Sequence, residues 1–131
     1  MRLLLDSNVV LWMLADRQRL TARALRLIED DRNELFFSLG SIWEVAIKIA
    51  KGKLAIPGGA AESLLPELRK LGVVVLPIDQ PSILRTQTLP QFPDHKDPFD
   101  RLLVAQALEL GLTILSADRD IVRYSAPVVW R

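Results

Sequence analysis

Leu3-Leu4-Leu5-Asp6-Ser7-Asn8 is the stretch that decides the fold, because it places a carboxylate directly after a short apolar strand. The same arrangement recurs along the chain, where Leu35-Phe36-Phe37 precedes Glu44 and Leu112-Thr113-Ile114-Leu115 precedes Asp118. In an open parallel sheet, ligands bind at the edge formed by the carboxyl ends of the strands. The pattern therefore predicts that acidic side chains from separate segments meet at one edge.

A fourth acid, Asp100, falls in the first turn of a helix that Asp97 and Pro98 are predicted to start, with Pro98 at the first helical position. Carboxylates brought this close repel one another and raise each other's pKa. A hard divalent cation, held by oxygen ligands, removes that repulsion. The acids therefore indicate a Mg²⁺ or Mn²⁺ site formed by Asp6, Glu44, Asp100 and Asp118.

Strands and helices are predicted to alternate along the chain. Short apolar runs indicate strands, and apolar residues at helical spacing between caps and glycines indicate helices. We expect strands at 2–6, 34–37, 73–75, 112–115 and 127–130, and helices at 9–15, 21–30, 41–51, 61–71, 79–87 and 97–111. Repeated strand–helix units predict an α/β fold, in which helices flank a mostly parallel central sheet of about five strands. We expect one domain over residues 1–131.

Composition excludes several classes of protein. The 17 basic and 16 acidic side chains leave a formal charge of +1, so a nucleic-acid partner must be sought in local patches. The absence of cysteine excludes a disulfide, a thiolate zinc site and a cysteine nucleophile. The apolar run after Arg2 is broken at Asp6, and no apolar stretch approaches membrane-spanning length. We therefore expect a cytoplasmic protein with no signal peptide and no membrane partner.

Each acid also has a purely structural interpretation. Asp6 and Asp118 fit helix N-caps. Glu44 fits a capping box with Ser41, and it also fits an ion pair with Lys48 one turn along the helix. The helix around Glu44 is apolar on nearly every side, which predicts a buried carboxylate that needs a partner. Taken together, acids at the ends of several separate elements favour a functional site.

Longer motifs extend this pattern over the whole chain. They are Asp6-Ser7-Asn8, Ser41-Ile42-Trp43-Glu44-Val45-Ala46-Ile47-Lys48, Gly52-Lys53-Leu54, His95-Lys96-Asp97-Pro98-Phe99-Asp100-Arg101-Leu102-Leu103-Val104-Ala105-Gln106-Ala107 and Ser116-Ala117-Asp118. In this order they resemble the PIN-domain nucleases, and above all the VapC-type toxins of bacterial and archaeal toxin–antitoxin pairs. The resemblance places the family's acidic quartet on Asp6, Glu44, Asp100 and Asp118, with Asp97 as a further acid that is either a ligand or only a helix cap.

The resemblance implies an endoribonuclease that depends on Mg²⁺ or Mn²⁺ and hydrolyses RNA phosphodiester bonds as the toxin of such a pair. This chemistry needs a deprotonated water and relief of negative charge, and divalent ions on a carboxylate cluster supply both. We expect three metal ligands, namely Asp6, Asp100 and Asp118. Glu44 is expected to hold a second ion or to orient the attacking water.

Hydroxyl and basic side chains near the acids are candidate auxiliary residues. Ser7 and Ser116 stand where family members often carry Thr, and both are expected to position carboxylates. Asn8 is either a site residue or a helix-start residue. Five basic side chains are candidate RNA contacts that would hold phosphates. Their alternative role is to balance the acids or to lie in solvent. They are Lys48, Lys51, Lys53, Arg101 and Arg119. His95, the only histidine, is either a general acid or a turn residue.

The apolar helix at 9–15 also predicts partners. It carries more apolar residues than one buried face requires, and an exposed surplus of this kind marks an interface. The resemblance implies two uses for such surfaces: a homodimer and a groove that accepts an antitoxin segment. Trp12 and Trp43 are expected in the core, and Trp130 is expected to close the last strand.

Three other functions fit parts of the pattern. A phosphatase of the haloacid-dehalogenase type also begins with an acid after its first strand, but it needs a second Asp where Asn8 stands. A catalytically inert RNA- or protein-binding module has no reason to cluster negative charge opposite phosphate. A receiver-like signalling domain needs a paired acid beside Asp6 and a lysine after the last strands. The residues favour the nuclease over all three.

Overall fold

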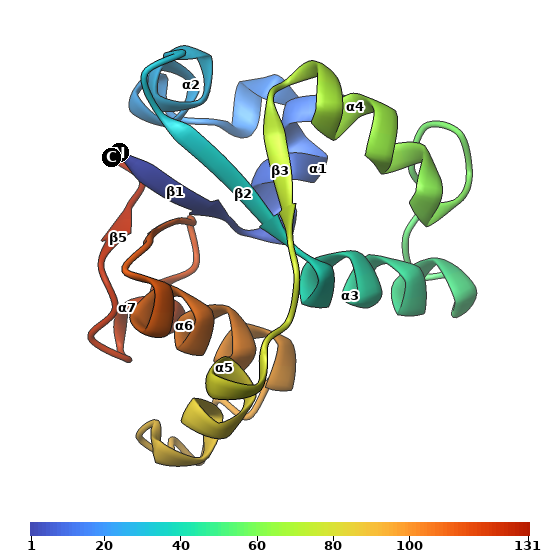
Figure 1. The fold of residues 1–131 in the computed structure, drawn as a ribbon. Coiled ribbons are helices and arrows are strands. Elements are labelled where there is room, and N and C mark those ends of the chain that lie inside the picture. Colours follow the sequence, from blue (N-terminus) through green and yellow to red (C-terminus); the bar gives the residue numbers. More distant parts are fainter.

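The computed structural model describes residues 1–131 and contains one five-stranded sheet in which all neighbouring strands are parallel. The strand order is β3-β2-β1-β4-β5, and Figure 1 shows β3, β2, β1 and β5 following one another across the sheet. The strands are β1 (Arg2–Leu5), β2 (Glu34–Ser38), β3 (Val73–Leu76), β4 (Thr113–Leu115) and β5 (Val128–Val129). The α/β class and the parallel sheet predicted from the sequence are thereby confirmed. Because β1 lies between β2 and β4, the strand order reverses there, and a crevice forms at the carboxyl ends of β1 and β4.

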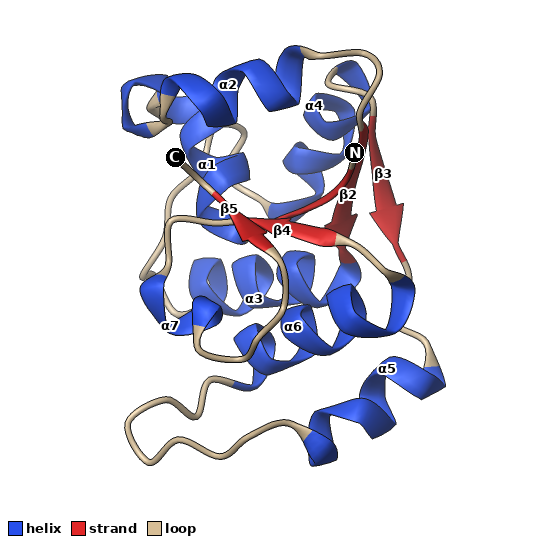
Figure 2. Cartoon of the chain, turned by 90° about the vertical axis from the view of Figure 1, so that its left-hand side faces the viewer, coloured by secondary structure: helices blue, strands red, loops and turns tan.

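Helices cover both faces of this sheet (Figure 2). The α-helices are α1 (Ser7–Ala15), α2 (Ala22–Glu29), α3 (Leu39–Ala50), α4 (Leu64–Lys70), α5 (Gln80–Arg85), α6 (Pro98–Leu110) and α7 (Arg119–Val122). Single turns of 3₁₀-helix occur at Arg17–Arg19, Ala61–Ser63 and Thr86–Thr88, and the last two extend α4 and α5 to the lengths expected from the sequence. None of the helices has both the length and the apolar surface that crossing a membrane requires.

Several helix ends lie where the sequence predicts them. The Thr21 hydroxyl accepts a hydrogen bond from the backbone N–H of Ala24 at 3.0 Å, and the Asp79 carboxylate accepts one from Ser82 at 2.8 Å. Gly111 ends α6 in the left-handed conformation, with φ at 68°, which glycine adopts without the steric cost of a Cβ. Caps and terminators act within one turn, so local sequence is sufficient to predict them.

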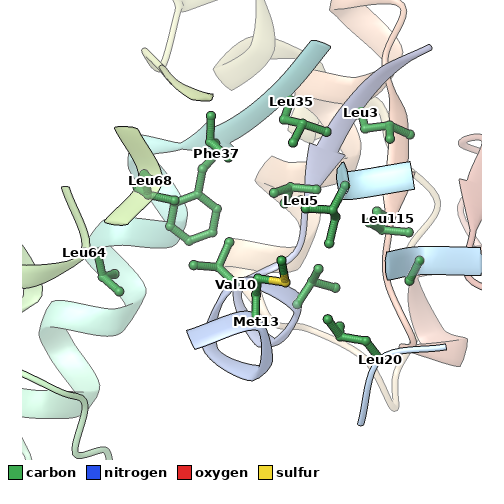
Figure 3. Packing of buried hydrophobic residues seen from close by; sticks show 14 of the residues in the cluster. Leu3, Leu5, Val10, Met13, Leu20, Leu35, Phe37, Leu64, Leu68 and Leu115 are labelled. Carbon is green, nitrogen blue, oxygen red and sulfur yellow. The ribbon is translucent and has the colours of Figure 1, made fainter. Parts of the chain in front are cut away.

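The core consists of two layers, one on each face of the sheet. Side chains alternate along β1, so Leu3 and Leu5 face the layer that contains α1, α2 and α4, whereas Leu4 faces the layer that contains α6. Figure 3 shows the first layer, where Phe37 packs near Leu64 and Leu68. Leu3, Leu4, Leu5 and Phe37 are each at most 1% exposed. This packing holds the carboxyl ends of β1 and β2 in place.

Helix α3 differs from the prediction in its start. Ser38 is the N-cap, and its hydroxyl accepts a hydrogen bond from the N–H of Gly40 at 3.0 Å. Ser41 therefore lies inside the helix, and the predicted capping box between Ser41 and Glu44 is wrong. The helix is also not buried on nearly every side, since only Gly40, Ser41 and Val45 are buried along it.

Trp43 and Val74 are large apolar side chains that lie exposed on the surface. Trp43 is 60% exposed, so its predicted place in the core is wrong, and its ring meets the ring of Phe99 edge-on at 5.2 Å. Val74 is 56% exposed because β3 is an edge strand and one of its faces is left uncovered. Trp12 is partly buried and packs 5.8 Å from Trp130, which directly follows β5. Burial of these apolar side chains depends on which elements pack over them, and that is not visible in the local pattern.

Candidate functional site

An acidic pocket of about 160 Å³ contains all four acids of the predicted quartet and Asp97 as well. No hydrophobic residue lines it, and Lys48 is its only basic side chain. The lining residues are Asp6, Ser7, Asn8, Glu44, Lys48, Asp97, Asp100 and Asp118. Acids that follow β1 and β4, one acid within α3 and two at the start of α6 thus meet in one place.

Asp6 is held from two sides. Its backbone N–H donates to the carbonyl of Leu115 at 3.1 Å, which continues the pairing of β1 with β4. One carboxylate oxygen accepts from the N–H of Ser7 at 2.7 Å, which makes Asp6 the N-cap of α1, and the other accepts from the Ser116 hydroxyl at 2.6 Å. Burial raises the pKa of Asp6, although both hydrogen bonds oppose the rise. The helix-cap role predicted as an alternative therefore coexists with a place in the pocket.

Glu44 is also held through both oxygens. The Ser7 hydroxyl donates to Oε1 of Glu44 at 2.8 Å, and the ammonium of Lys48 lies 3.7 Å from Oε2. The Glu44 side chain is 12% exposed, so this carboxylate is largely shielded from water. Ser7 therefore joins two acids of the pocket, since its backbone contacts Asp6 and its hydroxyl contacts Glu44.

The other acids come from the starts of α6 and α7. Asp97 is the N-cap of α6 and accepts from the N–H groups of Phe99 and Asp100 at 2.8 and 3.2 Å. Asp118 is the N-cap of α7 and donates its own N–H to the Ser116 hydroxyl at 3.0 Å. Burial, and after it the neighbouring charge of Asp97, raises the pKa of Asp100 to about 7. The pocket thus makes charge on Asp100 costly unless a cation is present.

The donors of this pocket fit a hard divalent cation. All five acids offer carboxylate oxygens, the ligands that Mg²⁺ and Mn²⁺ prefer. One ligand atom from each of Asp100, Asp118 and His95 lies within 4.8 Å of the other two. With Lys48 as the only base in the lining, the protein itself leaves most of the negative charge uncompensated. The residues that could hold a cation are therefore the predicted quartet, Asp97 and, through its cluster with Asp100 and Asp118, His95.

Comparison with known proteins agrees with this arrangement. A family model described as the PIN domain matches residues 3–127. The chain belongs to the PIN-domain family. Membership decides against the haloacid-dehalogenase and receiver alternatives. In agreement with that, the pocket of this PIN domain has an amide, Asn8, where the phosphatase would need its second acid.

Individual relatives cover nearly the whole PIN domain. The chain is 36% identical over 135 residues to the protein named Ribonuclease VapC22 from Mycobacterium tuberculosis, with 97% of each chain covered. Its fold is similar to that of a VapBC2 structure from Rickettsia felis bound to a promoter DNA fragment, with a TM-score of 0.72, 14% identity and full coverage of both chains. It is also similar to a toxin–antitoxin complex from Klebsiella pneumoniae, with a TM-score of 0.63, 20% identity and coverage of 96% and 94%.

His95 is buried beside an acid of the pocket, a contact that the sequence did not predict. Its side chain is 8% exposed, and its ring lies between Asp100 and Tyr124 rather than in an open turn. The Nε2 atom lies 3.0 Å from Oδ2 of Asp100. The sequence signal was the position of the only histidine in the same short motif as Asp97 and Asp100.

The burial of Arg101 contradicts the predicted role of this residue as an RNA contact. The residue is 9% exposed, and its guanidinium donates to the carbonyls of Pro90 and Thr86 at 2.8 and 2.9 Å. These bonds tie α6 to the segment that directly follows α5. With the guanidinium used inside the protein, no exposed cation remains at this position to hold a phosphate.

Proposed function

We propose that this PIN domain is an endoribonuclease that depends on Mg²⁺ or Mn²⁺ and acts as the toxin of a toxin–antitoxin pair. The observation that carries the proposal is the pocket of five carboxylates without a hydrophobic lining residue. Such a pocket repels an RNA phosphate unless divalent cations are bound in it. The sequence similarity to a protein named as a VapC ribonuclease supports the choice of RNA as substrate.

The residues of the pocket have distinct proposed roles. Asp6, Asp100 and Asp118 are the proposed metal ligands. A bound divalent ion lowers the pKa of a water ligand and offsets the charge that develops on the phosphate. Glu44 holds a second ion or orients the attacking water, and its carboxylate is itself fixed by Ser7 and Lys48. Ser116 fixes Asp6 and, through its contact with the Asp118 backbone, ties two ligands together.

Basic side chains lie on two sides of the acidic pocket. A groove of about 260 Å³ shares Glu44, Lys48 and Asp97 with the pocket and extends it to Lys51 and Lys53. On the other side, a cleft of about 470 Å³ contains Asp118 together with Arg23, Arg119 and Arg131. An RNA strand that follows both clefts passes over the acids, with cations near the phosphates on each side. We therefore assign the RNA contacts to Lys48, Lys51, Lys53 and Arg119.

The surface of α1 supports an antitoxin partner. Leu11, Trp12 and Leu14 remain only partly buried and line a groove of about 310 Å³ together with Leu54 and Ile56. Seven of its 11 lining residues are hydrophobic, so the groove fits an apolar segment of another chain. Its lining also includes Asn8, which belongs to the acidic pocket as well, so a segment bound here reaches the site.

A second apolar surface supports a homodimer. Leu39 and Trp43 of α3 and Ile83 and Leu84 of α5 are between 43% and 60% exposed. Helix α6 packs against both α3 and α5, so these side chains belong to one three-helix layer (Figure 2). Large apolar side chains gathered on neighbouring helices favour association with a second copy of the chain.

The test is cleavage of total RNA by the purified protein in Mg²⁺ or Mn²⁺, with EDTA and Asp100→Asn as the two negative controls. Asp31→Asn is the matched control, because Asp31 is an exposed acid outside the pocket. We expect discrete fragments from the wild type and from Asp31→Asn, and none from Asp100→Asn or in EDTA. Cleavage that survives Asp100→Asn would contradict the assignment of the site.

A further inference from the structure

His95 connects the acidic pocket to a buried tyrosine. Its Nε2 atom lies 3.0 Å from Oδ2 of Asp100, and its Nδ1 atom lies 2.7 Å from the hydroxyl oxygen of Tyr124. Tyr124, just after α7, is 2% exposed, and its ring packs edge-on against Phe92 at 5.0 Å. The loop that carries His95 is itself fixed, since the His95 N–H donates to the Phe92 carbonyl at 3.1 Å.

The direction of these hydrogen bonds follows from the groups involved. An ionised Asp100 only accepts hydrogen bonds, so Nε2 of His95 carries the hydrogen between them. In a neutral imidazole, Nδ1 then accepts, and the Tyr124 hydroxyl donates to it. The Arg101 guanidinium, which only donates, lies 3.5 Å from the Tyr124 oxygen and completes a chain that runs toward Asp100. With Asp100 ionised and the imidazole neutral, each of these donors points toward the carboxylate. The carbonyl of His95, 3.5 Å from the Tyr124 hydroxyl oxygen, is a more distant acceptor than Nδ1.

His95 contacts Asp100 but does not line the pocket. Its ring is buried between Asp100 and Tyr124. The contact engages Oδ2 of Asp100, and no protein group donates a hydrogen bond to Oδ1. A carboxylate held in this way has a fixed rotation, whereas a free one turns about its terminal torsion at little cost.

We propose that His95, oriented by Tyr124, is a positioning residue that fixes Asp100 and determines which of its oxygens binds the divalent ion. The inference rests on the proposed function, because it takes Asp100 to be a metal ligand. Groups that orient metal ligands typically contribute about 10- to 100-fold to metal affinity. In the alternative, Nε2 of His95 binds the divalent ion directly, and one of the ligand atoms is then a nitrogen instead of an oxygen.

Metal binding tests this without any assay of activity. Mn²⁺ affinity is measured by calorimetry for the wild type, His95→Ala, His95→Gln and His95→Asn. The Gln side chain places its amide N–H where Nε2 lies, so it keeps the donor to Asp100 and loses the contact with Tyr124. The shorter Asn side chain reaches only the place of Nδ1, so it keeps the contact with Tyr124 and loses the donor.

The expected result separates positioning from a structural role. We expect His95→Ala and His95→Asn to bind Mn²⁺ about 10- to 100-fold more weakly, and His95→Gln to lose less than about 10-fold. The proposal is overturned if His95→Ala binds Mn²⁺ as the wild type does, or if His95→Asn retains binding while His95→Gln loses it. A wild type that does not bind Mn²⁺ at all would instead overturn the proposed function, and this inference with it.

Two further measurements remain decisive if the His95 variants do not fold. Electron spin echo spectroscopy of Mn²⁺ bound to the wild type is expected to show no coupling to an imidazole nitrogen, and such coupling would make His95 a ligand and overturn the proposal. Tyr124→Phe keeps the buried ring and removes only the hydroxyl. We expect it to weaken Mn²⁺ binding, and unchanged affinity would contradict the proposed chain.

Discussion

The Ser116 hydroxyl donates to Oδ2 of Asp6 at 2.6 Å, although the two residues are 110 positions apart in the chain. The same hydroxyl oxygen accepts the backbone N–H of Asp118 at 3.0 Å. One side chain therefore connects the acid after β1 with the acid after β4. Ser116 is 2% exposed, so water cannot easily replace these bonds.

Replacement of Ser116 by alanine is expected to weaken both metal binding and RNA cleavage by about 10- to 100-fold, because Asp6 loses the donor that fixes it. Ser116→Thr keeps the hydroxyl and is the matched control, with expected retention of most activity. Calorimetry with Mn²⁺ and cleavage rates at saturating Mg²⁺ measure the two effects. Equal loss in both variants would show that packing around the residue, rather than its hydroxyl, is what matters.

The stability of the metal-free protein is expected to depend on pH through Asp100. The pKa of this carboxyl is raised from 3.8 to about 7 in the folded protein, so the folded state binds its proton more tightly than the unfolded chain does. The stability that the protonated group contributes is present below about pH 4 and is lost as the pH rises through about 7. Asp100→Asn should therefore gain stability relative to the wild type over this range.

Urea unfolding in EDTA at several pH values between about 4 and 8 measures this difference directly. Subtracting the free energy of unfolding of the wild type from that of the variant removes the contributions of other carboxyls. One of these is Asp30, whose pKa is lowered to about 2 by its hydrogen bonds with Arg32. Added Mn²⁺ is expected to restore stability at neutral pH in the wild type and much less in the variant. A difference that does not change with pH would refute the assignment of this titration to Asp100.

Lys51 and Lys53 are expected to contribute to RNA affinity through charge. Each single-stranded RNA phosphate neutralised by a lysine adds about 0.7 to the slope of log affinity against log salt. Lys51→Gln combined with Lys53→Gln should therefore lower that slope by up to about 1.4. Binding is measured in the Asp100→Asn background, which prevents cleavage, with Lys70→Gln of α4 as a control outside the groove. An unchanged slope would place the RNA on a different path.

Trp43→Glu is expected to shift the protein from dimer to monomer, because it introduces charge into the exposed apolar surface of α3 and α5. The Trp43 side chain is 60% exposed, so the fold should tolerate the change. Sedimentation equilibrium measures the assembly state, and circular dichroism checks the fold. Leu65→Gln on α4, which is exposed outside this layer, is the control and should leave assembly unchanged. A wild type that sediments as a monomer would contradict the proposed dimer.

Much of the fold could be predicted because its signals are local. Thr21, Asp79 and Asp97 cap helices where the sequence places them, since a cap requires only a side-chain oxygen and an N–H two or three residues away. The alternation of apolar strands with helices likewise predicts a parallel sheet. Acids placed after strands in such a sheet meet at one edge, which is why the pocket was predictable.

The exposure of side chains was less predictable, because it depends on neighbours distant in the sequence. Trp43 looked like a core residue and is exposed, whereas Arg101 looked like a surface cation and is buried. Arg101 is buried because the carbonyls of Thr86 and Pro90 lie close enough to accept its hydrogen bonds. These two carbonyls come within reach of Arg101 only because the chain between α5 and α6 folds back against α6.

The sequence by itself predicted that Asp6, Glu44, Asp100 and Asp118 meet at one edge of the sheet, where they line one pocket, because acids that follow parallel strands lie at the same edge. Only the tertiary structure decided which other side chains contact these acids. His95 and Tyr124 are 29 positions apart, yet the hydroxyl of Tyr124 contacts Nδ1 of His95, whose Nε2 contacts Asp100. Their contact arises where the loop before α6 packs against the end of α7, and no local pattern specifies that packing.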